Sequence, residues 1–311
     1  MDSDRHRLSR RRLLGGLGAL AAASALPPLP ARAATGEILT RALPATGEPL
    51  PLVGLGSWIT FNVGDDPALL AECTAVMRAF FAGGGRMIDS SPMYGSSQAT
   101  IGHGLAELDA VEQAYAADKV WTSSPDEGSA QIEASRQHWG VPRFDLLQVH
   151  NLVAREANLE TLLAMREAGE VRHVGITTSH GRRHDAVEQI MREAPLDFVQ
   201  LTYNIVDREA EQRLLPLARE RGIGVIANRP FQQKRLIRRL EGKPLPDWLA
   251  ETGAQNWAQF ILKFILSHPD VTCAIPATTQ VEHVRENLAA AREPLPDAAL
   301  RRRMADYVAA L

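Results

Sequence analysis

Three short apolar runs alternate with two longer amphipathic stretches in residues 144–203, which read FDLLQVHNLVAREANLETLLAMREAGEVRHVGITTSHGRRHDAVEQIMREAPLDFVQLTY. The runs at 144–150, 171–177 and 198–203 are rich in Val, Ile, Leu and aromatic residues, as expected of strands buried on both faces. The stretches between them repeat their apolar residues at helical spacing. This alternation indicates a parallel sheet that is covered by helices.

The same alternation continues on both sides of this stretch. Five more strands are predicted at 51–58, 86–90, 115–119, 224–229 and 271–277. Helices are predicted at 67–81, 97–108, 129–139, 158–168, 183–193, 207–221, 254–267 and 280–291. Eight such units within about 250 residues predict a single α/β domain, a (β/α)8 TIM barrel. An open doubly wound sheet is the alternative, but the glycine-rich turn that should follow its first strand is absent.

Both ends of the predicted barrel carry an additional element. Residues 41–52 contain Thr46-Gly47-Glu48 between apolar flanks, which predicts an N-terminal β-hairpin that closes the barrel floor. The run Arg301-Arg302-Arg303 is typical of the exposed face of a C-terminal helix.

The composition is that of an ordinary globular protein with an acidic body. The chain has 311 residues, of which 45% are hydrophobic and 23% charged, and a net charge of −3. Residues 1–33 carry +4, which leaves −7 for residues 34–311. An acidic domain has few cations for phosphates, so we expect no nucleic-acid partner. Two cysteines, Cys73 and Cys273, are too few for a disulfide framework or a cysteine-based zinc site.

Residues 1–33 have the pattern of an export signal. A basic segment at 1–12 precedes an apolar segment at 13–26, which is shorter than the ~20 residues that cross a bilayer. Ala31-Arg32-Ala33 supplies small residues at a cleavage site, and residues 9–14, SRRRLL, resemble the twin-arginine motif.

We therefore divide the chain into a twin-arginine-type signal peptide at 1–33 and a barrel domain at 34–311. The protein is expected to use the twin-arginine export machinery and to reside in the periplasm or another extracytoplasmic space. In its mature form it is expected to have no stable membrane span. An uncleaved membrane anchor is the alternative interpretation of the leader.

Four reactive side chains fall where a barrel places its chemistry, at the carboxyl ends of the strands. Asp89 ends the second predicted strand and Tyr94 lies in the loop that follows it. Lys119 ends the third strand and His150 ends the fourth. A carboxylate, a phenol, an ammonium and an imidazole are thus expected on one rim.

These four groups suit proton delivery to a carbonyl oxygen. A phenol with a pKa near ~10 is a slow donor, but a neighbouring cation lowers its pKa and a carboxylate holds that cation in place. A neutral imidazole can orient the carbonyl oxygen. No Ser or Cys has a paired base, and no histidine cluster has the spacing of metal ligands. Metal-free carbonyl reduction is the interpretation that follows.

At this point the sequence resembles the aldo-keto reductases, from about residue 41 to the C-terminal region. The resemblance rests on ordered motifs: GLGSW at 54–58, MIDSSPMYG at 87–95, DLLQVH at 145–150, GEVRHVGI at 169–176, VQ at 199–200, IP at 275–276 and ENL at 286–288. It implies that Asp89, Tyr94, Lys119 and His150 form the catalytic tetrad of that family. It also implies a nicotinamide cofactor that lies extended across the barrel mouth.

The resemblance further assigns cofactor and substrate contacts. The cofactor-binding residues that it implies are Gly56, Ser57, Thr177, Gln200, Asn228, Arg229, Thr278, His283, Glu286 and Asn287. Ala277 and His283 stand where many members of the family have Lys and Arg for the 2′-phosphate, so NADP(H) is favoured while NAD(H) stays possible. The implied substrate pocket consists of Trp58, Met93, Trp121 and Asn151.

Two functional hypotheses follow from these residues. The first is an exported oxidoreductase that reduces an aldehyde or ketone, a small carbonyl substrate, with Tyr94 as general acid. The alternative is a sensor or carrier that binds a nicotinamide nucleotide with little or no turnover, since no free nicotinamide pool is expected outside the cytoplasm. The basic residues of segment 231–248 are predicted to form a solvated helix face, with a clamp for cofactor phosphates as the other interpretation.

Overall fold

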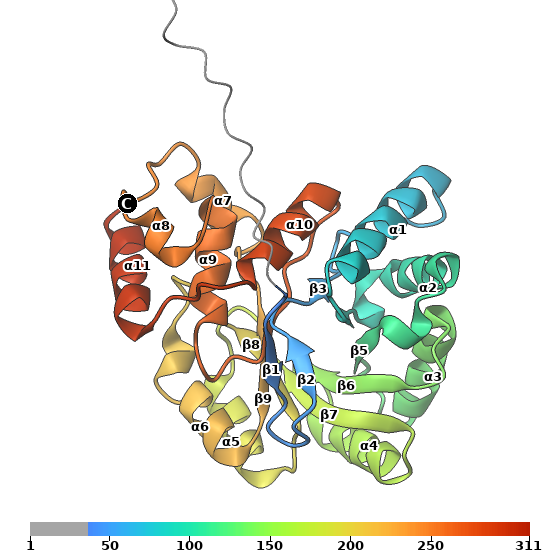
Figure 1. Ribbon diagram of the computed structural model, residues 1–311. Coiled ribbons are helices and arrows are strands. Elements are labelled where there is room, and N and C mark those ends of the chain that lie inside the picture. Colours follow the sequence, from blue (N-terminus) through green and yellow to red (C-terminus); the bar gives the residue numbers. More distant parts are fainter. Residues whose placement is uncertain (1–36) are drawn as a thin grey trace, which may run out of the picture. The chain divides into compact units, whose positions relative to one another are not determined.

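Eight parallel strands form a barrel in the computed structural model, which describes residues 37–311. The predicted export signal lies outside the described residues. In sequence order the strands are β3 (Leu55–Gly56), β4 (Met87–Asp89), β5 (Tyr115–Val120), β6 (Phe144–His150), β7 (Val171–Thr177), β8 (Phe198–Thr202), β9 (Gly224–Asn228) and β10 (Cys273–Ala274). Each strand pairs with the next, and bridges from Val53 to Ala274 and from Gly56 to Ala277 join the last strand to the first. The predicted (β/α)8 barrel is confirmed (Figure 1).

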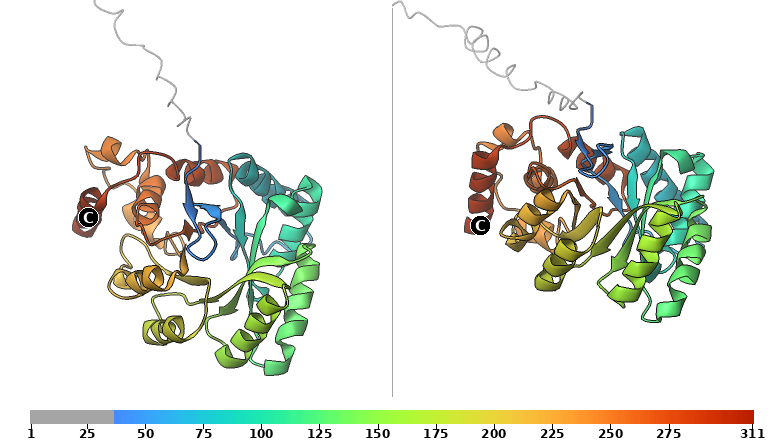
Figure 2. Two further views of the ribbon diagram at one scale, coloured as in Figure 1. Left: turned by 60° about the horizontal axis from the view of Figure 1, so that its bottom comes forward. Right: turned by 90° about the horizontal axis from the view of Figure 1, so that it is seen from below.

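Helices surround the barrel, as Figures 1 and 2 show. They are α1 (Pro67–Ala82), α2 (Ser97–Leu108), α3 (Gly128–Trp139), α4 (Arg155–Glu167), α5 (His184–Glu193), α6 (Leu214–Arg221), α7 (Arg235–Leu240), α8 (Leu249–Thr252), α9 (Trp257–Leu266), α10 (Val281–Ala290) and α11 (Ala298–Ala310). The carboxylate of Asp66 accepts hydrogen bonds from the first amides of α1, and Asn256 and Asp297 cap α9 and α11 in the same way. Within residues 37–311, none of these helices has both the length and the apolar character that a membrane span needs.

The strand predicted at 271–277 is shorter in the structure, where β10 holds only Cys273–Ala274, and two other predicted elements are divided for local reasons. The helix predicted at 207–221 is divided into a short 3₁₀ turn, Glu209–Glu211, and α6. Pro216 has no amide hydrogen and fits only the first turn of a helix, so α6 begins two residues before it. The strand predicted at 51–58 is likewise divided. Its first residue belongs to the hairpin strand β2 (Pro49–Pro51), and Leu55–Gly56 forms the barrel strand β3, with Val53 adding an isolated bridge.

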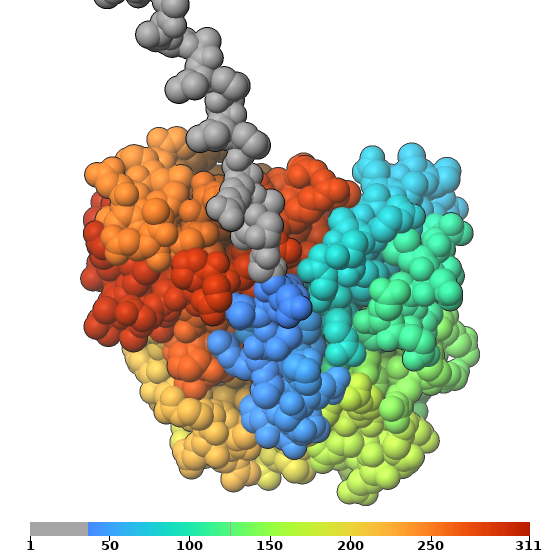
Figure 3. Space-filling model, viewed as in Figure 1, coloured from blue at the N-terminus to red at the C-terminus, as the bar shows by residue number. Residues whose placement is uncertain are grey.

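The predicted N-terminal hairpin is present and closes one end of the barrel. Strand β1 (Thr40–Ala42) pairs with β2 in antiparallel fashion, and Gly47 makes the turn with a φ of 75°. Leu43 and Leu50 of this hairpin are buried with Tyr115, Phe198 and Cys273 inside the barrel. Figure 3 shows the hairpin (blue) filling the space between the C-terminal helices (red) and α1 (cyan). The hairpin therefore acts as an apolar plug.

A glycine allows the barrel to close. The amide of Gly56 donates to the carbonyl oxygen of Pro276 over 3.0 Å, where β3 meets the segment after β10. A Cβ atom on Gly56 would lie 2.8 Å from the carbonyl oxygen of Ile275, closer than real Cβ contacts. Only glycine lets these two backbones approach. Gly56 also lies at the end of the barrel where the carboxyl ends of the strands meet.

The contact between α2 and α3 yields a test of this packing. A Cβ at Gly102 would overlap the backbone carbonyl oxygen of His138, whereas a Cβ at Gly104 would meet the flexible end of Met77. Both Gly→Ala changes gain roughly 1 kcal/mol of helix propensity. We expect Gly102→Ala to lower the free energy of unfolding in urea by about 1–3 kcal/mol because the two helices must separate. Gly104→Ala is the matched control and should cost less; equal losses would contradict the close approach of α2 and α3.

Candidate active site

The layer of the barrel interior nearest the carboxyl ends of the strands, called the upper layer below, is polar. The interior further from those ends is apolar. Side chains two residues apart on a strand face the same side, so each barrel strand contributes to the interior at alternate positions. Met87, Ala117, Leu146 and Ile226 pack in the apolar interior. Two residues further along the same strands come the polar side chains of Asp89, Lys119, Gln148 and Asn228, and His150, Thr177 and Gln200 complete the polar set at the carboxyl ends. All of these polar residues are buried.

The centre of this layer is an ion pair between Lys119 and Asp89. The ammonium Nζ lies 2.6 Å from Oδ2 of Asp89 and donates a second hydrogen bond of 2.6 Å to the carbonyl oxygen of Ser90. The other carboxylate oxygen, Oδ1, accepts a 2.7 Å hydrogen bond from Nε2 of Gln200. Burial lowers the pKa of Lys119, but the negative charge of Asp89, together with that of Tyr94 when it ionises, outweighs burial and raises it. Lys119 is therefore a fixed cation.

Tyr94 lies directly above this cation. It ends the 3₁₀ turn Pro92–Tyr94, and Nζ of Lys119 is 5.2 Å from the centre of its ring. The sequence predicts that the cation lowers the pKa of the phenol, and Lys119 does act in that direction. Burial has the larger effect, however, and raises the pKa of Tyr94. The phenol consequently keeps its proton at neutral pH and can donate it.

The imidazole of His150 stands edge-on to the Tyr94 ring, with 5.7 Å between the ring centres. Burial and the nearby Lys119 lower the pKa of His150 to about 3. The imidazole is therefore neutral at physiological pH and has one ring N–H to donate. Its Nδ1 atom lies 2.8 Å from the hydroxyl of Ser91, a residue that the sequence analysis did not single out.

Asp118 does not compete for the ammonium, although it is adjacent to Lys119 in sequence. Its carboxylate faces α2 and α3, where it accepts hydrogen bonds from Nε2 of Gln98 at 2.7 Å and from Nε1 of Trp139 at 2.6 Å. Burial raises the pKa of Asp118 to about 7, and these hydrogen bonds and Lys119 oppose the increase. Because side chains alternate along β5, Asp118 and Lys119 point to opposite faces of the strand.

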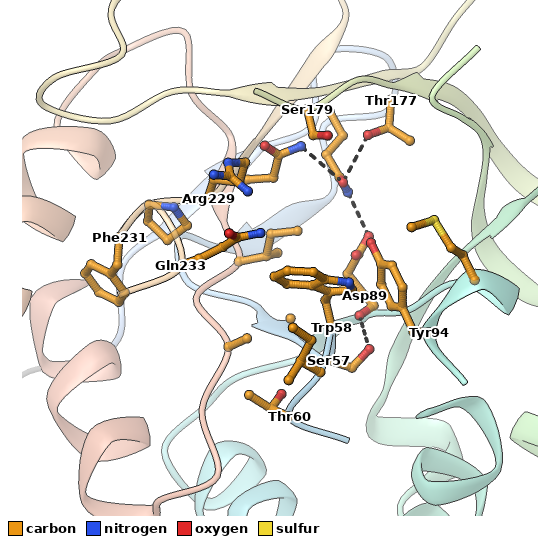
Figure 4. Close-up of a pocket in the computed structure, with 18 of the residues that line it drawn as sticks. Ser57, Trp58, Thr60, Asp89, Tyr94, Thr177, Ser179, Arg229, Phe231 and Gln233 are labelled. Atoms are coloured by element: carbon orange, nitrogen blue, oxygen red, sulfur yellow. Dashed lines mark hydrogen bonds between the residues drawn. The ribbon is translucent and has the colours of Figure 1, made fainter. Parts of the chain in front are cut away.

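An open cavity of roughly 430 Å³ lies over the polar layer (Figure 4). Many residues proposed from the sequence line it, namely Gly56, Ser57, Trp58, Asp89, Met93, Tyr94, His150, Asn151, Thr177, Gln200, Asn228 and Arg229. Lys119 lies beneath the cavity, where it contacts Asp89. Trp121, Thr278, His283, Glu286 and Asn287 are not among the lining residues. Thr278 and His283 contact each other at 3.2 Å instead, in the segment that follows Ala277 of the cavity wall.

Several of the lining residues are not among those that the sequence predicts. They include Thr60, Ser179, His180, Phe231 and Gln233. All of them follow barrel strands, but the sequence gives no signal for which loop residues turn inward. Lys234 also lines the cavity, whereas Arg238 lies exposed on α7. The basic segment 231–248 thus supplies a cation to the cavity at its start and a solvated helix face further on.

The cavity has one basic side. In Figure 4, Arg229 and Phe231 lie on the opposite side of Trp58 from Tyr94. Burial lowers the pKa of Arg229, and the neighbouring cations Arg235 and Arg182 lower it further against the opposing charge of Asp207. A negatively charged group placed here would relieve the repulsion among these guanidinium groups.

Strained backbone surrounds the cavity mouth. Among residues 37–311, the non-glycine residues with left-handed backbone all follow barrel strands at the mouth, except Asp109. They are Ile59 after β3; Asn151, Leu152 and Ala154 after β6; His180 and Arg183 after β7; and Arg229, Gln232, Gln233 and Lys234 after β9. Arg183 connects two of these loops by donating to the carbonyl oxygen of Asn151 over 2.6 Å. Such clusters of strained residues are typical of ligand sites.

The chain as a whole is similar to known proteins of one family. The sequence profile of the Aldo/keto reductase family matches residues 52–303. Methylglyoxal reductase YeaE of Escherichia coli K12 is 26% identical over 258 residues, which cover 81% of this chain and 89% of that protein. The NADH-specific methylglyoxal reductase of the same organism is 24% identical, with 83% of this chain and 95% of that protein covered.

Solved structures agree with the observed fold. An aldo/keto reductase from Klebsiella pneumoniae, solved in complex with NADP and acetate, superposes with a TM-score of 0.74 and 21% identity. The superposition covers 88% of this chain and 96% of that chain. The family profile spans most of the barrel, from the end of the hairpin to α11. The chain therefore belongs to the aldo/keto reductase family.

Proposed function

We propose that this protein reduces a small aldehyde or ketone to an alcohol, with Tyr94 as the proton donor and a nicotinamide dinucleotide as the cofactor. The observation that carries the proposal is the position of the Tyr94 phenol. It is protonated at neutral pH, lies over the Lys119 ammonium and stands beside a neutral imidazole at the floor of an open cavity. This arrangement suits a general acid for a carbonyl oxygen.

The roles of the side chains follow from their charges. A carbonyl oxygen between the Tyr94 hydroxyl and the His150 imidazole accepts a hydrogen bond from each. As the carbonyl carbon is reduced, Tyr94 transfers its proton to the oxygen and becomes a phenolate. The Lys119 ammonium stabilises that phenolate, and Asp89 holds the ammonium in place. A reduced nicotinamide held in the cavity would supply the hydride that the carbonyl carbon needs.

The residues of the cavity fit a dinucleotide. The guanidinium of Arg229 and the ammonium of Lys234 provide cations for the diphosphate, and the mutual repulsion of Arg229 with Arg182 and Arg235 favours an anion there. Thr177 donates to Oε1 of Gln200 over 3.1 Å, which gives the wall a polar patch for a carboxamide. Thr278, His283, Glu286 and Asn287 follow the wall residue Ala277 and remain the proposed contacts of the adenosine end.

Either form of the cofactor is compatible with the relatives. The Klebsiella structure was solved with NADP, while one Escherichia coli relative is NADH-specific. Two relatives are methylglyoxal reductases, which makes a small dicarbonyl the first substrate to test. A protein that binds the dinucleotide without turnover is the competing function.

We also propose that residues 1–33 direct export through the twin-arginine pathway to an extracytoplasmic location. The sequence SRRRLL at 9–14, followed by the apolar segment 13–26 and Ala31-Arg32-Ala33, supports this proposal. Export of an already folded barrel would carry a bound dinucleotide with it.

The first test replaces the proton donor. Tyr94→Phe should reduce kcat for methylglyoxal reduction by about 10²–10⁴-fold, because the phenylalanine ring has no proton to give. Consumption of NADPH and NADH is followed in protein that begins at Ala34, and the dinucleotide Kd should stay nearly unchanged. Turnover by Tyr94→Phe at the rate of the unaltered protein would contradict the role of Tyr94. A wild-type protein that binds dinucleotide but completes at most one turnover would support the sensor or carrier instead.

A second test examines the cations of the cavity. Lys234→Met should weaken dinucleotide binding by about tenfold and reduce its dependence on salt, because one charge contact with phosphate is lost. Binding is measured by the change in nicotinamide or protein fluorescence at two salt concentrations. Lys243→Met removes the same charge from an exposed loop away from the cavity and serves as the matched control. Equal affinities for both variants would overturn the placement of the diphosphate.

A third test addresses export. Replacing Arg10 and Arg11 by Lys should leave the full chain in the cytoplasm of a bacterium with a twin-arginine pathway, because that pathway reads the paired arginines. Cell fractionation and the size of the protein band report the outcome. The control replaces Arg5 and Arg7 by Lys, which conserves charge outside the motif. Normal export of the Arg10/Arg11 variant would contradict this route.

A further inference from the structure

One buried oxygen atom contacts both His150 and the turn that carries Tyr94. The hydroxyl Oγ of Ser91 lies 2.8 Å from Nδ1 of His150, and it also accepts a 3.2 Å hydrogen bond from the amide of Met93. Met93 is part of the 3₁₀ turn Pro92–Tyr94, which Ser91 caps at its N-terminus. The same oxygen therefore contacts both the turn that carries Tyr94 and the imidazole beside it.

The donors and acceptors around the Ser91 hydroxyl determine the direction of the Ser91–His150 hydrogen bond. A serine hydroxyl has one proton to donate and two lone pairs that accept. The amide of Met93 can only donate, so it occupies one lone pair. Within residues 37–311, the remaining partner of the hydroxyl is Nδ1 of His150. If Nδ1 carried the imidazole proton, the buried hydroxyl proton would have no acceptor, at a cost of about 1–3 kcal/mol.

We propose that Ser91 is a positioning residue that fixes the tautomer of His150. Ser91 donates to Nδ1, so the single proton of the neutral imidazole resides on Nε2, the nitrogen available to the cavity. Because the same oxygen caps the turn of Tyr94, it also fixes the phenol relative to the imidazole. Both hydrogen-bond donors then point at one carbonyl oxygen before the substrate arrives. This inference rests on the proposed reductase function for its catalytic meaning, but the tautomer itself does not.

The neighbouring Ser90 provides a matched comparison. It is buried to the same extent as Ser91, and its hydroxyl pairs with Ser97 over 2.9 Å rather than with His150. Removing one or the other hydroxyl therefore separates loss of a buried hydrogen bond in general from loss of the bond to the imidazole.

The tautomer can be measured without substrate or cofactor. In protein labelled with ¹⁵N-histidine, two-bond proton–nitrogen correlations distinguish an Nε2–H imidazole from an Nδ1–H imidazole, and the spectrum of His150→Gln identifies the His150 signals. We expect Nε2–H in the unaltered protein, a shift toward Nδ1–H or a mixture in Ser91→Ala, and no change in Ser90→Ala. An Nδ1–H imidazole in the unaltered protein would refute the proposal, and so would a Ser91→Ala spectrum identical to it. The unaltered spectrum decides the assignment even if Ser91→Ala does not fold.

Kinetics adds a readout that a purely structural serine would not produce. Ser91→Ala should lower kcat about 10–100-fold while the dinucleotide Kd stays constant, because only the orientation of the imidazole is lost. A normal kcat together with an altered tautomer would refute the positioning role. Absence of turnover in the unaltered protein would instead refute the proposed reductase, and it would leave the tautomer assignment as measured.

Discussion

The buried ion pair between Lys119 and Asp89 is the constraint on which the rest of the site depends. Two opposite charges inside a barrel are stable only if their remaining hydrogen-bonding capacity is also satisfied. The carbonyl oxygen of Ser90 and the amide of Gln200 meet that requirement, and they tie β4, β5 and β8 together at the upper layer. The pair thereby provides a permanent positive charge under Tyr94 and beside His150. That charge opposes ionisation of the imidazole and favours ionisation of the phenol.

Burial acts on the three titrating groups in different directions, and this difference organises the chemistry. It raises the pKa of the phenol, lowers that of the imidazole, and is outweighed at Lys119 by nearby negative charge. The result is two neutral hydrogen-bond donors over one fixed cation. The apolar interior below them, made of residues such as Met87 and Leu146, keeps water away from the underside of the Lys119–Asp89 ion pair. The hairpin residues Leu43 and Leu50 close that interior from the other end.

The periodicity of the sequence was sufficient to predict the barrel, because buried parallel strands and amphipathic helices leave different patterns. It also placed Asp89, Lys119 and His150 on one rim, since the carboxyl ends of parallel strands meet there. The loops were not predictable in the same way. Ile59, His180 and Lys234 adopt left-handed backbone without the glycine that usually signals it. Ser91 was missed because its role depends on a contact 59 positions away in sequence.

The seam where the barrel closes is among the shortest of its strand junctions, as are the two-position pairings of β3 with β4 and of β9 with β10 on either side of it. Strands β3 and β10 contain two residues each, and isolated bridges from Val53 and Gly56 join them, whereas β6 and β7 pair over six positions. Local opening of a protein follows its weakest contacts, so the barrel is expected to open first around this seam and the short pairings beside it. Gly56 and Ala277, on its two sides, both line the cavity. A ligand that spans them would act as an additional contact across the seam. Ligand binding would then stabilise the closed barrel against local opening, and opening of the seam would in turn weaken ligand binding.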